Sequence, residues 1–162
     1  MKKILLILAV FGLILGFSGL AIAANSDTQT VTFSVAAINE ISITGAPTLV
    51  VDSATAGSEP NDDTDATTTY AITTNETVKK ITGVIEENMP ANVTLKIALV
   101  APSGGSSEGI KTLSTAPVDL VTSIETVADG AGNTITYTLS ATVAAGVVTS
   151  DTRIVTLTLT NE

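Results

Sequence analysis

The chain has 162 residues, a formal net charge of −9 and neither cysteine nor histidine. These absences exclude a Ser-His-Asp triad, a thiol nucleophile, disulfide bonds and the usual zinc sites. The negative charge also argues against nucleic acid or anionic lipid as a partner. We therefore expect a protein that is not an enzyme and that acts through its backbone edges, loops and surface.

The N-terminus has the pattern of a secretory signal peptide. Lys2 and Lys3 precede an apolar run over residues 4–15, and Ala21 and Ala23 supply the small side chains that a cleavage site needs. We predict a signal peptide at 1–23 and an exported protein that is periplasmic, secreted or held at the cell surface. The run is short for a helix that spans a bilayer, which disfavours a retained anchor as the alternative.

Residues 24–162 are predicted to form one domain, an all-β, Ig-like antiparallel sandwich of about eight or nine strands. Apolar residues alternate with Thr or Ser in short segments bounded by Gly, Pro, Asn or Asp, which is typical of half-buried strands. In chain order, the first strand is expected at 30–35 and continues after a break at 41–44, and further strands are expected at 49–51, 68–73, 80–85, 93–99, 110–113, 120–124, 134–143 and 153–160.

One hairpin stands out in this pattern. Residues 129–133 read Asp-Gly-Ala-Gly-Asn, a composition that favours a tight turn. We expect this turn to pair residues 121–126 with residues 134–143.

Acidic residues gather in the segment 53–68, which is rich in Asp, Ser, Gly and Pro and is expected to be an exposed loop. Carboxylate oxygens are ligands that calcium prefers, so this loop is a candidate calcium site. The spacing matches no known calcium-binding loop, and a merely solvated acidic loop is the alternative. The residues proposed as ligands are Glu59, Asp62, Asp63 and Asp65, with Asn61 beside them.

Two Asn-X-Thr triplets are candidate glycosylation sequons, one at Asn75 and one at Asn92. Both are expected at turns or strand ends, where an acceptor would be accessible. Their use depends on whether the host glycosylates exported proteins. The alternative is that such triplets arise by chance in a chain that is rich in threonine.

The segment 24–36 directly follows the predicted cleavage site and has the alternation of a strand. Val31, Phe33 and Val35 lie on one face, and Thr30, Thr32 and Ser34 lie on the other. This alternation resembles the donor strands of exported Ig-like pilins and of secreted biofilm-matrix subunits. The chain lacks the cysteine pair of usher-assembled pilins and has no sortase motif.

This resemblance implies that the N-terminal strand of one copy completes the sheet of another, so that the partner is a second copy of the chain. The expected function is a structural or adhesive surface protein, with Val31, Phe33 and Val35 as the strand-exchange face. A small recognition module for glycans or proteins, with calcium in the acidic loop, is the alternative. Its weakness is the scarcity of aromatic residues that could stack on sugars.

Overall fold

The computed structural model describes residues 25–162, so the predicted signal peptide at 1–23 lies outside the described residues. These residues fall into two units, residues 25–35 and Ala36–Glu162. Within 25–162 the single helix is a three-residue 3-10 turn, Val143–Ala145, and no described helix is long enough to cross a membrane.

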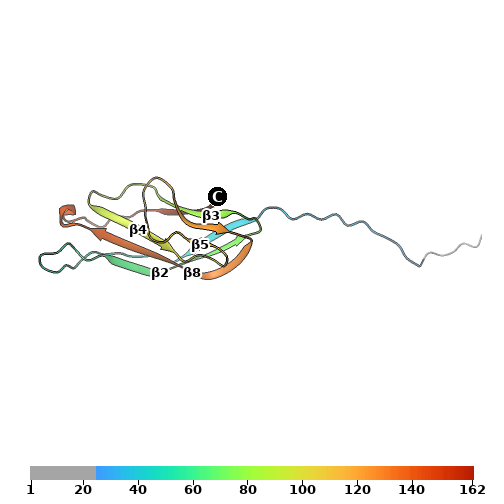
Figure 1. The fold of residues 1–162 in the computed structure, drawn as a ribbon, viewed down its shortest axis with the longest axis horizontal. Coiled ribbons are helices and arrows are strands. Elements are labelled where there is room, and N and C mark those ends of the chain that lie inside the picture. The colour runs from blue at the N-terminus through green and yellow to red at the C-terminus, as the bar shows by residue number, and fades with distance from the viewer. Residues whose placement is uncertain (1–24) are drawn as a thin grey trace, which may run out of the picture. The chain divides into compact units, whose positions relative to one another are not determined.

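The unit Ala36–Glu162 is a sandwich of two antiparallel sheets (Figure 1). The five-stranded sheet has the order β1-β2-β8-β4-β6, with bounds Asn39–Thr44, Asp63–Thr74, Val127–Ala141, Val93–Leu99 and Lys111–Thr112. The four-stranded sheet has the order β5-β7-β3-β9, with bounds Ser106–Ser107, Val118–Ile124, Lys79–Ile85 and Val155–Asn161. The predicted all-β sandwich and its number of strands are confirmed.

Alternating side chains explain why these segments become strands. Along β3 every second residue from Lys79 to Ile85 is buried, and the residues between them are half-buried. The inward faces of both sheets meet in one apolar core, as expected when the period of the pattern matches the pleat. The buried core residues are Tyr70, Ile72, Ile81, Ile85, Leu95, Ile97, Leu99, Leu113, Leu120, Val121, Ile124, Ile135, Tyr137 and Leu157.

The predicted hairpin around residues 129–133 is wrong. These residues lie inside β8, which runs without a break from Val127 to Ala141 and pairs with β2 and β4. The strand before it, β7, belongs to the other sheet and pairs with β3 and β5. The pairing of β2 with β8 shifts register between Tyr70 and Ile72, opposite the glycine-rich stretch. The glycines therefore lie at a bulge within β8 and not at a turn.

Two expected strands are not formed within the described chain. Residues 26–38 and 45–53 form no strand, so the expected strands at 30–35 and 49–51 do not pair in a sheet. The acidic loop is shorter than expected, because β2 already begins at Asp63.

Tyr70 links the core to the connection that follows β4. Its ring is fully buried, and its hydroxyl donates a hydrogen bond of 2.6 Å to the Val100 carbonyl. Burial, and then the nearby Asp129 carboxylate, raise the pKa of Tyr70 well above its usual value, so the hydroxyl keeps its proton and remains a donor.

Replacing Tyr70 tests this hydrogen bond. We expect Tyr70→Phe to lower the free energy of unfolding by about 1 kcal/mol, because the buried ring stays while the hydrogen bond is lost. Tyr137→Phe is the matched control, since no hydrogen bond of the Tyr137 hydroxyl is found among the described residues, and we expect it to change stability by roughly 0.5 kcal/mol or less. Urea denaturation followed by circular dichroism measures both, and equal losses would contradict this role of Tyr70.

Candidate functional site

The two sheets do not cover one another completely. In the four-stranded sheet, the pair Ile85 and Val155 ends the β3–β9 ladder. In the five-stranded sheet, the β4–β8 ladder continues to the pair Val93 and Ala141 at the end of the sandwich next to the β3–β4 connection. Near this end, the inward-facing Val93 of β4 and Leu139 of β8 are only half-buried, whereas Leu95 and Tyr137, two residues further along their strands, are buried.

A groove of about 1100 Å³ opens over these side chains. Its floor includes Val93 and Leu95 of β4 and Tyr137 and Leu139 of β8, all on the inward face of the sheet. Residues 45–54 and residues 148–153 form its walls. We call this hollow the edge groove; its floor is apolar although it opens to the surface.

Backbone groups along both walls are free to pair. Residues 46–49 follow β1, and residues 148–150 precede β9. Within the described part of the chain, neither stretch makes a backbone–backbone hydrogen bond. In addition, β1 and β9 are both edge strands, each paired on one side only. Unpaired backbone beside an apolar floor can accept an added strand.

Charged groups at the edge groove pair with one another. Arg153 lies 2.7 Å from the Asp151 carboxylate. The backbone amide of Thr152, and then the Arg153 side chain, hold the pKa of Asp151 below its usual value. This carboxylate is therefore ionised at neutral pH and is neither a raised-pKa acid nor part of a converging acid pair, which glycosidase chemistry would need.

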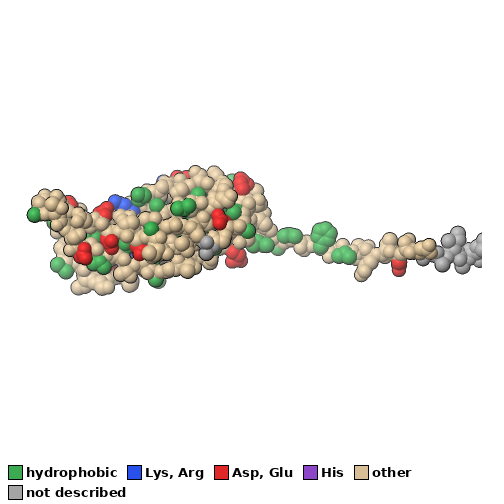
Figure 2. Space-filling view, turned by 90° about the horizontal axis from the view of Figure 1, so that it is seen from below, with side chains coloured by type: hydrophobic (Ala, Val, Ile, Leu, Met, Phe, Trp, Pro, Cys, Tyr) green, Lys and Arg blue, Asp and Glu red, His purple; other side chains and the backbone are tan. Residues whose placement is uncertain are grey.

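The segment 25–35 carries the side chains that the sequence predicts as a strand-exchange face. Val31, Phe33 and Val35 are 72%, 87% and 80% exposed. Figure 2 shows hydrophobic side chains along this extended segment. Such exposure of large apolar side chains at regular spacing is typical of a surface that becomes covered in an assembly.

The acidic residues proposed for calcium are mostly engaged as acceptors of backbone hydrogen bonds. Glu59 accepts from the Val143 amide at 2.6 Å, and Asp63 accepts from the Val50 amide at 2.7 Å. Asp65 accepts from the amide and the hydroxyl of Thr67 at 2.9 and 2.8 Å, whereas Asp62 is exposed. Within residues 25–162 no three acidic side chains are grouped so that they could hold a metal ion.

Calcium binding at this loop stays a prediction, and calorimetry tests it. If Glu59, Asp62, Asp63 and Asp65 bind calcium, they must exchange these backbone contacts for the ion, and a titration should release or absorb heat with one binding site per chain. A titration without heat at millimolar calcium would remove the proposed site, and Asp62→Asn with Asp65→Asn is the matched variant.

Both sequons lie at turns, and their amides already have partners. The Asn75 side chain accepts a hydrogen bond from the Ile38 amide and donates one to the Ala36 carbonyl, each of 2.8 Å. Asn92 donates to the Ala144 carbonyl at 3.3 Å. A glycan on Asn75 would disturb the contact that ties residues 36–38 to the end of β2.

No protein-family model matches the chain, and comparisons with curated proteins and with solved structures also give no match. The candidate site thus depends on the geometry of the chain itself. Its principal elements are the edge groove and the exposed alternating face of residues 25–35.

Proposed function

We propose that the protein is an exported, non-enzymatic structural subunit that assembles into fibres by strand exchange. The segment 25–35 of one copy lies in the edge groove of the next copy and pairs with the backbone of its walls. The observation that supports this proposal most directly is a groove with a partly exposed apolar floor in a chain that also carries an exposed segment with one apolar face.

The chemistry of the two surfaces is complementary. Val31, Phe33 and Val35 repeat every second residue, as do the inward side chains of β4 and β8 that form the groove floor. As a strand, seven residues of the donor segment would span roughly 23 Å, because a strand rises about 3.3 Å per residue. The opposite face of the donor, with Thr30, Thr32 and Ser34, would remain in contact with water.

This arrangement leads to a fibre instead of a closed dimer. The donor segment and the edge groove are different surfaces of the same chain, so each added copy leaves a free donor at one end and a free groove at the other. A second copy of the chain is therefore the partner. The net negative charge makes copies repel one another and so limits non-specific association between them.

Deleting residues 25–36 tests the role of the donor. The remaining chain contains both sheets, so we expect it to stay folded and monomeric and to form no fibres. Circular dichroism, light scattering and negative-stain electron microscopy report on these properties. A deletion variant that unfolds, or a complete chain that stays monomeric at high concentration, would contradict strand exchange.

Point substitutions in the donor test which face is covered. Phe33→Asp should weaken assembly about 10- to 100-fold, since burying a large apolar side chain contributes roughly 1.5–3 kcal/mol. Thr32→Asp places the same charge on the opposite face and should assemble nearly as well as the unchanged chain. Sedimentation at several protein concentrations measures the difference, and equal effects would count against the assigned face.

Substitutions in the groove wall test the acceptor. Val148 lines the edge groove and is 46% exposed, whereas its neighbour Val147 does not line the groove and is 98% exposed. We expect Val148→Asp to block assembly and Val147→Asp to leave it largely intact. Mixing each variant with a synthetic peptide of residues 25–36 separates acceptor from donor defects, because only the Val148 variant should fail to bind the peptide.

A further inference from the structure

A buried lysine lies at the end of the sandwich away from the edge groove. Lys79 is the first residue of β3, opposite Asn161 of β9, whereas Ile85 and Val155 form the pair at the groove end of the same ladder. Lys79 takes an inward position in the alternation of β3 and is only 7% exposed. A lysine is rarely buried without a specific partner, because removing its charge from water is costly.

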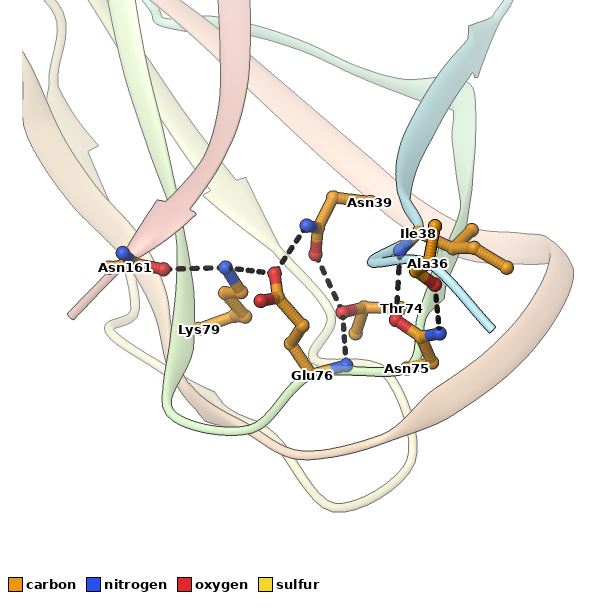
Figure 3. A network of polar contacts seen from close by, with 8 residues as sticks. All are labelled: Ala36, Ile38, Asn39, Thr74, Asn75, Glu76, Lys79 and Asn161. Carbon is orange, nitrogen blue, oxygen red and sulfur yellow. Dashed lines mark hydrogen bonds and ion pairs between the residues drawn. The ribbon is translucent and has the colours of Figure 1, made fainter. Parts of the chain in front are cut away.

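Two groups contact the Lys79 amine at close range. It donates to Oδ1 of the Asn161 carboxamide at 2.5 Å and lies 2.6 Å from Oε2 of Glu76 (Figure 3). A C=O bond is about 1.23 Å long, so the Asn161 carbonyl carbon lies only one bond beyond the contacted oxygen. Exchanging the oxygen and nitrogen of the amide would leave this carbon in the same place.

Further hydrogen bonds hold Glu76 in position. Asn39 donates to the same Glu76 oxygen at 2.5 Å, and the Thr74 hydroxyl donates to Asn39 at 2.7 Å and accepts from the Glu76 amide at 3.1 Å. These contacts connect the end of β2 to the start of β1. The hydrogen bonds from Lys79, and then from Asn39, hold the pKa of Glu76 below its usual value, so the group is an ionised carboxylate at neutral pH.

The arrangement is specific to Lys79 among the lysines of residues 25–162. Lys80 is paired with Asp119, Lys111 with Glu108, and Lys96 donates to the Ser140 hydroxyl. None of these three has a hydrogen bond to a side-chain amide within the described residues, whereas Lys79 contacts an amide and a carboxylate together.

The geometry points to a covalent cross-link: the Lys79 amine attacks the Asn161 carboxamide carbon and forms an intramolecular amide bond between β3 and β9. The bond between Nζ and the carboxamide carbon forms, and the bond from that carbon to Nδ2 breaks. Glu76 takes a proton from the Nζ ammonium, which frees the amine to attack, and passes this proton to Nδ2. Nζ loses a second proton once the new bond has formed, and this proton also leaves with Nδ2, which departs as ammonium. No oxidant, metal or other reactant is consumed, so atoms and charge balance.

Folding supplies what makes this otherwise slow amide exchange feasible. The ladder between β3 and β9 holds nucleophile and electrophile in contact, which converts an encounter in solution into a reaction within one site. The attacking nitrogen must be uncharged, so proton removal by Glu76 is part of the step and the rate rises with pH. The product joins two residues that are 82 positions apart in the chain.

Intact mass measurement of the folded, purified protein tests the cross-link. We expect a mass lower than that of the sequence by one ammonia, about 17 Da. Tryptic digestion should yield a branched peptide in which the C-terminal residues 154–162 are joined to the peptide that contains Lys79. Incubation at neutral and at alkaline pH should show faster formation at the higher pH.

Matched variants separate the reaction from general effects on folding. Lys79→Arg keeps the charge and the donors but has no nucleophilic amine, and Asn161→Ala removes the carboxamide, so both should keep their sequence mass. Glu76→Gln cannot take the proton and should slow the loss of ammonia at least tenfold, while Lys80→Arg on the same strand should lose ammonia like the unchanged chain.

The proposal is overturned by a folded, unchanged chain that keeps its full sequence mass at both pH values. Conversion of Asn161 to aspartate alone would also overturn it, because that reaction adds water, releases ammonia and so raises the mass by about 1 Da without a branched peptide. Both results come from the chain without substitutions, so they do not depend on whether a variant folds or whether the protein forms fibres.

Discussion

The contact between the inward faces of the two sheets is the interaction on which the rest of the structure depends. Without disulfide bonds, the fold relies on burying alternating apolar side chains and on the ladders that these side chains bring together. Gly83 shows how little free space the core leaves: a Cβ atom there would lie 2.6 Å from Leu120 Cδ1 on the neighbouring strand β7 and 3.3 Å from Leu113 Cδ2, which follows β6 of the other sheet. Because packing is this dense, a region where one sheet ends early becomes a groove and is not filled by relaxation.

The two ends of the sandwich consequently have different chemistry. At one end, the floor of β4 and β8 is apolar and partly exposed, and the walls of the edge groove have unpaired backbone groups. At the other end, a polar network of Glu76, Lys79, Asn161 and Asn39 closes the space between the sheets (Figure 3). The first end is suited to receiving a strand, and the second is suited to holding β9 firmly in its sheet.

The edge groove and the Lys79 site are separate surfaces, and a cross-link at one is mechanically compatible with strand exchange at the other. In a fibre built by strand exchange, tension passes from the donor segment into the start of β1 and from the edge groove into β9 and its neighbours. The Asn75 contacts tie residues 36–38 to the end of β2, and Lys79 joins β3 to β9. A covalent bond between β3 and β9 would keep the edge strand beside the groove in place under load.

Local pattern in the sequence determined the class of fold. Period-two alternation identified most strands, since side chains on a pleated strand point alternately to core and solvent whatever the partner strand is. It also identified the apolar face of Val31, Phe33 and Val35, while the Asp-, Ser-, Gly- and Pro-rich composition identified the exposed loop around Glu59. Composition alone removed histidine and cysteine chemistry from consideration.

Tertiary structure decided everything that depends on which strands are neighbours. The glycines at 130 and 132 read as a turn in sequence, but pairing with β2 and β4 keeps β8 continuous through them. Neither the edge groove nor the Lys79 site was predicted, because each brings together residues that are far apart in the chain. Alternation places Leu139 and Lys79 on inward faces of their strands. Only the lengths and order of the opposing strands show that Leu139 lies in the floor of the edge groove and that Lys79 meets the Asn161 amide.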